Sequence, residues 1–458
     1  MKRLIFVSII FCIVQFSKAQ QNETNVPAWA EKSIHNKLKR MEWWTEARFG
    51  MFIHWGLYSV ASRHEWVQSR EKLSKDAYKK YFDAFDPDLY DPVEWARKAK
   101  ATGMKYVVIT AKHHEGFSLW DTKFSEYKAT NSKAKRDLLR PLIEAFRKEG
   151  LRVGLYFSLI DWDHPEFEID RLHPMRDSKE ARLQARDMNK YRAFMRNQLT
   201  ELLTQYGRID QLFLDYSYSG AEGKGRLDWD SESLVKLVRK LQPDIILDDR
   251  LDLMDTNWGW DYKTPEQYIP KEWPKVNGYQ VAWETCQTFS GSWGYYRDEY
   301  TWKSSHQLVT MLSEVVSKGG NLLLNIGPNA RGTLDSRAEE RMIEIGNWMK
   351  FNNRAIYGCT QAPMEFSKPE NCFLTYNPIT KRLYVHVINW PIKSLHLIGF
   401  KGKISYAQLL ADGSEIKFKE NIAEGSHTTE TTGKDDVMLE LPVRKPDSIL
   451  PVIELILK

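Results

Sequence analysis

Polar side chains stand at the ends of five short apolar runs in this 458-residue chain. His54, Tyr156 and Asp215 each close one run, and two more runs are followed by His113-His114-Glu115 and by Asp248-Asp249-Arg250. One such residue alone is more often a structural cap, but five strand ends of this kind indicate a site. Imidazole, carboxylate and guanidinium groups gathered at one edge of a sheet can bind a polar ligand and transfer protons.

The carboxylates are the most informative of these groups. Asp215 follows Leu212-Phe213-Leu214, where a charge is poorly solvated unless a partner such as Arg250 compensates it or a reaction uses it. Hydrolysis of a glycoside normally needs two carboxyl groups, one as nucleophile or base and one as acid. The candidates for the second carboxyl group are Glu266 and Glu284. We expect Glu266 to lie on a loop over the mouth of the barrel that is predicted below.

The elements that position these groups alternate between short apolar runs and longer amphipathic stretches. The apolar runs predict buried parallel strands at Phe49–Trp55, Tyr106–Thr110, Val153–Phe157, Leu212–Asp215, Ile245–Leu247 and Leu322–Ile326. Helices are predicted at Pro92–Thr102, Asp137–Lys148, Ser178–Tyr206, Ser231–Leu241 and Asp335–Asn352. At this length the pattern favours a closed (β/α)8-like, TIM-type barrel, with two of its eight strands not located. Catalytic groups of such barrels lie at the carboxyl ends of the strands.

The pattern changes after Gly358. Segments 373–376, 383–388, 437–441 and 453–457 are of β type, turn residues separate them, and helical periodicity is absent. This predicts a C-terminal antiparallel β-sandwich domain. We therefore expect a signal peptide at residues 1–20, a catalytic barrel at 21–357 and the sandwich at 358–458.

The first twenty residues have the order of a signal peptide. Lys2 and Arg3 precede an apolar run from Leu4 to Phe16, and small and polar residues follow. The run is too short for a permanent membrane anchor, so we expect a periplasmic or secreted protein. The mature chain would hold three cysteines, which leaves open a Cys359–Cys372 disulfide or three separate thiols.

The overall composition excludes some partners. The net charge of +5 is spread along the chain without a basic block, so no nucleic-acid partner is expected. The sequence contains 17 Trp, whose flat faces can stack on sugar rings, although Trp also fills protein cores. A homo-oligomer is left open.

Several of these segments, in this order, resemble glycoside hydrolase family 29, the α-L-fucosidases. The matching motifs are Trp43 to Gly56, Glu65-Trp66, Lys112 to Phe117, Gly154 to Ser158, Trp283 to Cys286, Ser292 to Tyr295 and Gly320 to Pro328. The resemblance covers about 310 residues and implies the barrel, the C-terminal sandwich and a retaining exo-acting α-L-fucosidase that needs no metal or cofactor. Its substrates would be fucosylated oligosaccharides or glycoconjugates.

The resemblance also assigns roles residue by residue. Asp215 matches the nucleophile, although Phe213-Leu214-Asp215 stands where the family often has Trp-Phe-Asp. Glu266 is the preferred acid/base, and Glu284 is the alternative acid or a sugar-binding group. The implied fucose-binding residues are His54, Glu65, Trp66, His113, His114, Tyr156, Arg250 and Trp293.

The implied reaction is a double displacement, in which Asp215 attacks the anomeric carbon while Glu266 protonates the leaving oxygen. Two other classes compete with it. A metal-dependent hydrolase would use the histidines and Asp215 as ligands, but adjacent His113 and His114 on an extended segment should point in opposite directions. A non-catalytic fucose-binding or carbohydrate-binding protein on the same fold is the other alternative.

Overall fold

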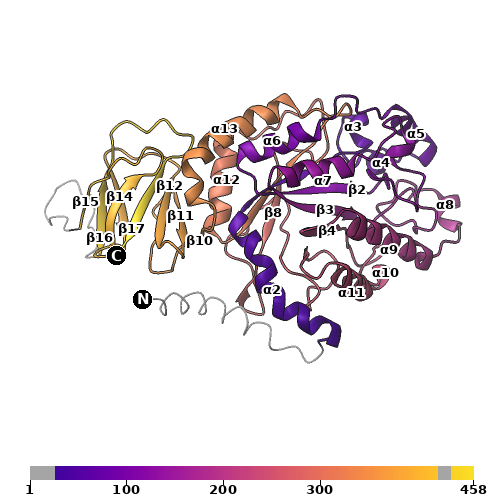
Figure 1. Cartoon of the computed structure of the whole chain (residues 1–458), viewed down its shortest axis with the longest axis horizontal. Helices are drawn as coiled ribbons and strands as arrows, with labels where there is room; N and C mark the ends of the chain where they lie inside the picture. Colours follow the sequence, from indigo (N-terminus) through magenta and orange to yellow (C-terminus); the bar gives the residue numbers. More distant parts are fainter. Residues whose placement is uncertain (1–25, 421–434) are drawn as a thin grey trace.

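The computed structural model describes residues 26–420 and 435–458, so the predicted signal peptide lies outside the described residues. Helices surround a group of strands in the larger part, and a stack of strands lies beside it at the C-terminal end (Figure 1). Within the described ranges, no helix combines the length and the apolar character that a membrane span requires.

Seven parallel strands curve into the wall of a TIM-like barrel. They lie in the order β5-β4-β3-β2-β1-β9-β8. Their bounds are β1 (Phe49–Ile53), β2 (Tyr106–Lys112), β3 (Arg152–Ser158), β4 (Gln211–Asp215), β5 (Ile246–Leu247), β8 (Glu284–Thr288) and β9 (Asn321–Ile326). The six predicted strands are confirmed with ends shifted by one or two residues, and β8 is one of the two that the sequence did not locate.

An irregular segment, Asp261 to Gln267, takes the place of the eighth strand. On one side the backbone N–H of Asp261 donates to Leu247 O of β5 at 2.8 Å. On the other side Glu284 N donates to Lys263 O at 2.8 Å and Gln267 N donates to Cys286 O at 3.0 Å. We call this segment the closing segment. Glu266 thus lies in an irregular segment, as expected of a loop, but not over the barrel mouth, because the backbone of this segment forms part of the wall.

Helices cover the outside of the barrel (Figure 1). They are α2 (Ala28–Ala47), α3 (Tyr58–Ala61), α4 (Val67–Arg70), α5 (Lys75–Ala84), α6 (Pro92–Thr102), α7 (Leu139–Lys148), α8 (Lys179–Leu183), α9 (Met188–Gln205), α10 (Arg226–Trp229), α11 (Ser231–Leu241), α12 (Ser305–Ser317) and α13 (Ser336–Asn352). The single helix predicted over Ser178–Tyr206 is two helices. Asp187 is the N-cap of α9, because its side chain accepts from the backbone N–H of Asn189, and the connection from α8 ends there.

The barrel interior is filled in layers because alternate residues of each strand point inward. Along β4 the inward positions are Gln211, Phe213 and Asp215, which run from a polar floor through an apolar middle to a polar top. The inward positions of β9 follow the same order of polar, apolar and polar residues, with Asn321, Leu323 and Asn325. The apolar middle layer therefore separates two polar layers at opposite ends of the barrel.

The C-terminal strands form two antiparallel sheets, as predicted. One contains β10 (Thr360–Gln361), β11 (Cys372–Asn377), β12 (Arg382–Val387), β17 (Val452–Leu457) and β14 (Ile404–Leu409), and the other contains β13 (Ser394–Ile398), β16 (Asp436–Glu440) and β15 (Phe418–Lys419). A two-stranded hairpin, β6 (Lys275–Val276) and β7 (Tyr279–Gln280), projects from the barrel part. Trp348 Nε1 of α13 donates to Leu450 O at 2.7 Å, so the sheets are attached to the barrel helices.

Candidate active site

A cavity of about 660 Å³ opens at the carboxyl ends of the barrel strands. Its lining includes two carboxylates, two cations and three aromatic rings: Glu65, Glu266, Arg70, Lys303, Trp66, Trp293 and Tyr216. A polar cavity with aromatic walls at this face of a barrel is the usual place for a ligand. Four of the sequence-predicted site residues, Glu65, Trp66, Glu266 and Trp293, line this cavity. Of the others, all except Glu284 contact these four directly or through one another, as described below.

One guanidinium joins the two principal carboxylates. Arg250 Nη1 donates to Asp215 Oδ1 at 2.7 Å and Arg250 Nη2 donates to Glu266 Oε2 at 2.8 Å. Because the guanidinium is a rigid planar fork, these two carboxylate oxygens are at most about 8 Å apart. The second oxygen of Asp215, Oδ2, accepts from Tyr156 OH at 2.8 Å. Asp215 is therefore held through both oxygens.

Arg250 is itself fixed by the closing segment. Its Nε donates to Thr264 Oγ1 at 2.9 Å, and that hydroxyl donates to Asp249 Oδ1 at 2.7 Å. Burial opposes the charged guanidinium, but Asp215 and Glu266 outweigh it and raise the pKa of Arg250. Arg250 therefore stays charged and compensates the buried negative charge of Asp215.

The hydrogen bonds of His54 determine which ring nitrogen carries its proton. Asn325 Nδ2 donates to Trp293 O at 2.7 Å, so Asn325 Oδ1 is the acceptor that lies 2.6 Å from His54 Nδ1. Burial lowers the pKa of His54, and the neighbouring His113 lowers it further, so the ring is neutral. His54 Nδ1 therefore carries the proton and Nε2 is an acceptor.

His114 reaches the same state through a different partner. Ser158 Oγ donates to Ile160 O at 2.7 Å and lies 2.6 Å from His114 Nδ1, which must be the donor in that pair. Burial lowers the pKa of His114, so its Nε2 is also a neutral acceptor.

The rings of His113 and His114 lie on the same side, contrary to the prediction. Their centroids are 4.0 Å apart because the two residues follow β2 in a turn rather than in an extended strand. His113 Nδ1 lies 3.4 Å from Glu115 Oε2. In the described ranges 26–420 and 435–458, no three His, Cys, Asp or Glu side chains form a group that could hold a metal ion.

Glu65 and two tryptophans complete the inner wall. Glu65 Oε2 accepts from the backbone N–H of Gly294 at 2.9 Å and of Trp293 at 3.2 Å, which leaves Oε1 for a ligand. The Trp293 ring lies 5.1 Å from that of His54, and the Trp66 ring lies 4.8 Å from that of His114. Each aromatic face therefore adjoins an imidazole acceptor.

Glu284 lies elsewhere, on the floor of the barrel. Its carboxylate accepts from Tyr106 OH and from Gln211 Nε2, the latter at 2.9 Å, and it is fully buried. Gln211 and Asp215 are the first and last residues of β4, so this pair lies about 13 Å below the level of Asp215. The sequence expectation that Glu284 binds sugar or donates a proton does not agree with this position, because the apolar middle layer lies between it and the cavity.

Three residues of the site were given no role by the sequence reasoning. Asn325, Ser158 and Thr264 orient His54, His114 and Arg250, respectively. Asn325 and Ser158 occur in the quoted motifs, and each stands at the polar end of a strand, which was the available signal.

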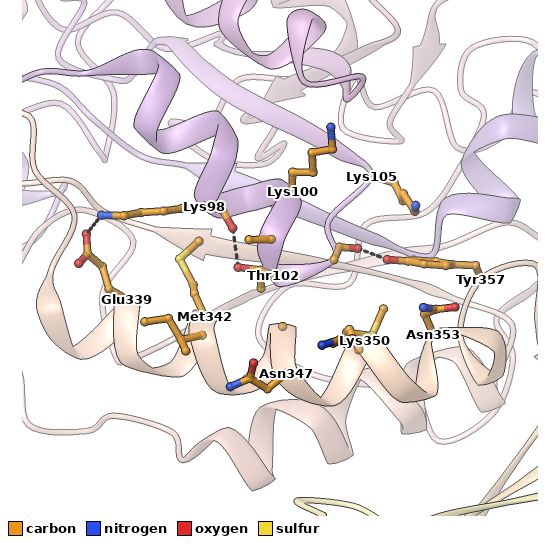
Figure 2. A pocket seen from close by; sticks show the side chains of 15 residues that line it. Lys98, Lys100, Thr102, Lys105, Glu339, Met342, Asn347, Lys350, Asn353 and Tyr357 are labelled. Carbon is orange, nitrogen blue, oxygen red and sulfur yellow. Dashed lines mark hydrogen bonds and ion pairs between the residues drawn. The ribbon is translucent and has the colours of Figure 1, made fainter. Parts of the chain in front are cut away.

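A second cavity, of about 490 Å³, lies between α6 and α13 (Figure 2). It is lined by lysines, but Lys98 pairs with Glu94 and Glu339, and Lys100 pairs with Glu149. Tyr357 OH closes one end by donating to Gly103 O. This groove has no pair of carboxylates comparable with Asp215 and Glu266.

The three cysteines of the described chain are free and buried, so no disulfide joins Cys359 and Cys372.

Comparisons with known proteins agree on one family. The family model described as alpha-L-fucosidase matches residues 12–354. Human plasma alpha-L-fucosidase is 31% identical over 409 residues, which cover 82% of each chain. The solved structure of alpha-L-fucosidase isoenzyme 1 from Paenibacillus thiaminolyticus is 41% identical with a TM-score of 0.86, covering 92% of this chain and 99% of that one. A family 29 alpha-L-fucosidase from Bacteroides thetaiotaomicron, solved as a trapped covalent intermediate with 2-fluoro-fucosyl fluoride, is 27% identical with a TM-score of 0.77 and covers 96% of this chain and 98% of that one.

Proposed function

The chain belongs to the α-L-fucosidases of glycoside hydrolase family 29, and from this premise we propose that it removes terminal α-L-fucose from fucosylated glycans by a retaining double displacement. The observation that carries the proposal is the unit in which Arg250 bridges the carboxylates of Asp215 and Glu266. The bridge limits the two bound oxygens to at most about 8 Å apart, a range that includes the ~5–5.5 Å between the carboxyl groups of retaining enzymes. The trapped covalent intermediate of the related bacterial enzyme supports the same route.

In the first step Asp215 attacks the anomeric carbon of fucose. The bonds from Arg250 and Tyr156 orient its two oxygens and fix the direction of the carboxylate. Glu266 protonates the departing oxygen, and a covalent fucosyl-enzyme forms.

In the second step Glu266 accepts a proton from a water molecule that attacks the fucosyl-enzyme, which releases fucose with its configuration retained. Glu266 suits this double role because its side chain lines the cavity and is 41% exposed, so water can reach it. Glu284 has no such access.

Fucose recognition follows from the protonation states of the site. His54 Nε2, His114 Nε2 and Glu65 Oε1 are all acceptors, and the ring hydroxyls of fucose can each donate to one of them. The indole faces of Trp66 and Trp293 offer apolar contact for the C5 methyl group. His113 adds a third imidazole to this group.

We also propose the domain limits and the destination of the protein. Residues 1–20 act as an export signal, 21–357 form the catalytic domain and 358–458 form the C-terminal domain. Export places the enzyme in the periplasm or outside the cell, where fucosylated glycans are accessible. The approach of the sheets to α13 at Trp348 suggests a buttressing role for the C-terminal domain.

Release of nitrophenol from nitrophenyl α-L-fucoside tests the proposal, with Asp215→Ala and Glu266→Ala as variants. We expect azide to restore turnover to both, because it can enter either vacated space. The Asp215 variant should form the β-fucosyl azide, since azide attacks directly, and the Glu266 variant should form the α-fucosyl azide, since azide intercepts the covalent intermediate. Glu272→Ala, an exposed carboxylate on the same stretch, is the matched control.

The products decide the assignment. Formation of the same anomer by both variants would contradict the roles given to Asp215 and Glu266. Binding of fucose by the wild-type protein without turnover of any fucoside, natural oligosaccharides included, would contradict enzymatic function and favour a carbohydrate-binding protein.

A further inference from the structure

An arginine without a carboxylate partner lies in the outer wall of the active-site cavity. Arg70 is the last residue of α4 and lines the cavity together with Trp66. Its basic neighbours in the chain are paired, since Arg63 binds Glu71 and Lys72 binds Asp177. In the part of the chain that the structure describes, Arg70 has no such ion pair.

The contact between Arg70 and His64 does not supply an acceptor. His64 Nδ1 accepts from the backbone N–H of Trp66 at 2.9 Å, so the proton of the neutral ring is on Nε2. This Nε2 lies 3.2 Å from Arg70 Nη1, and the two groups therefore meet as donor against donor. Burial lowers the pKa of His64, which agrees with a neutral ring. The guanidinium of Arg70 is left without a protein acceptor in this contact.

The remaining charges of the cavity do not compensate Arg70. Lys303 lies on the wall that follows β8, and its Nζ donates to the backbone oxygen of Thr288 at 2.6 Å rather than to a carboxylate. Of the cavity carboxylates, Glu65 binds backbone N–H groups through Oε2 and keeps Oε1 for the inner site, and Glu266 binds Arg250. The outer part of the cavity therefore presents unpaired positive charge beside the inner site.

We propose that Arg70 binds an oxyanion carried by the sugar to which fucose is linked, so that acidic fucosylated glycans are preferred substrates. The planar guanidinium matches the geometry of a carboxylate or a sulfate ester, each of which can accept two parallel N–H bonds. This inference rests on the proposed function, because the anion is positioned by fucose in the inner site.

The test compares kcat/KM for three fucosides with the same linkage and the same neighbouring sugar, which is neutral, sulfated or carboxylated. The wild-type enzyme should prefer one acidic substrate roughly tenfold, as expected for a charge-assisted contact near solvent. The preferred acid identifies the source of the oxyanion. Added salt should reduce the preference, because exposed charges are screened.

Two variants isolate the residue. In Arg70→Gln the ratio of acidic to neutral kcat/KM should fall to within about twofold of one. Lys72→Gln removes a nearby charge that is already paired with Asp177, so it should keep the wild-type ratio. Circular dichroism of both variants checks that they are folded.

The outcomes separate this inference from the one on which it rests. Turnover of the neutral fucoside without preference for either acid would overturn the role of Arg70 alone. An undiminished preference in Arg70→Gln would do the same. Failure of the wild-type enzyme to hydrolyse any of the three would overturn the proposed function, and the role of Arg70 with it.

Discussion

Replacing Glu284 by glutamine should stabilise the protein at alkaline pH and leave it nearly unchanged in acid. Glu284 is fully buried on the barrel floor, where Tyr106 OH and Gln211 Nε2 donate to its two oxygens. No cation in the described part of the chain is bonded to it. Burial therefore dominates and raises the pKa of Glu284 to about 7, from an ordinary value of 4.5.

The sign of the pH dependence follows from this shift. Between pH 4.5 and 7 the folded state keeps a proton that the unfolded state releases, so the free energy of unfolding falls as the pH rises. Each unit of pKa difference corresponds to about 1.4 kcal/mol, so the ionisation of Glu284 costs about 3 kcal/mol of stability at pH 8. The side-chain amide of glutamine has a similar shape and no charge, and its substitution should recover most of that amount.

Urea unfolding of wild type and Glu284→Gln at pH 5 and pH 8 measures the effect. We expect the variant to gain about 3 kcal/mol at pH 8 and less than about 1 kcal/mol at pH 5. Glu272→Gln, which alters an exposed carboxylate, should show no difference between the two pH values. A Glu284→Gln variant that is destabilised at pH 8, or altered equally at both pH values, would refute the reasoning, because the charged carboxylate would then be the favoured form.

Three other substitutions test separate features. Arg250→Met leaves Asp215 without its cation and should raise the activation free energy for kcat/KM by about 3 kcal/mol. Millimolar guanidinium should restore part of the lost kcat/KM. Asp261→Asn leaves buried Arg40 and Arg239 uncompensated and should lower the urea unfolding free energy by about 3–5 kcal/mol, whereas Asp255→Asn at the surface should not. Gly346→Val places a side chain against the backbone oxygen of Ala101 and should lower the thermal midpoint, at a cost of about 1–3 kcal/mol. Unchanged values in these three measurements would contradict, in turn, the charge compensation, the buried ion pairs and the close approach of α13 to α6.

The wall of the barrel was predictable where its strands are continuously apolar. β8 was missed because four of its five residues, Glu284, Thr285, Gln287 and Thr288, are polar, so the segment contains no apolar run. The eighth position gave no strand signal because the closing segment makes only isolated bridges, such as that between Glu266 and Cys286. Pairing of this kind is long-range and depends on neighbours that a local pattern does not contain.

The site was predictable where its residues end continuously apolar strands. Because the strands are parallel, His54, Tyr156 and Asp215 lie at one end of the barrel, and their polarity at the end of an apolar run was sufficient to identify them. Glu284 could not be assigned in this way, since the sequence does not reveal that it begins a strand rather than ends one. The tautomers of the histidines also required the structure, because they depend on Asn325 and Ser158 across neighbouring strands.

The position of the Glu266 carboxylate depends on the register in which the closing segment pairs with β8. It is attached to β8 through a few backbone hydrogen bonds, among them the one from Gln267 N to Cys286 O. A slip of one residue along β8 would turn the carboxylate away from the cavity, and a slip of two would move it by about 7 Å. Neither change would disturb β4, which carries Asp215. Insertions or deletions in the preceding loop would therefore move Glu266, the proposed acid/base, while Asp215, the proposed nucleophile, and the seven regular strands keep their positions.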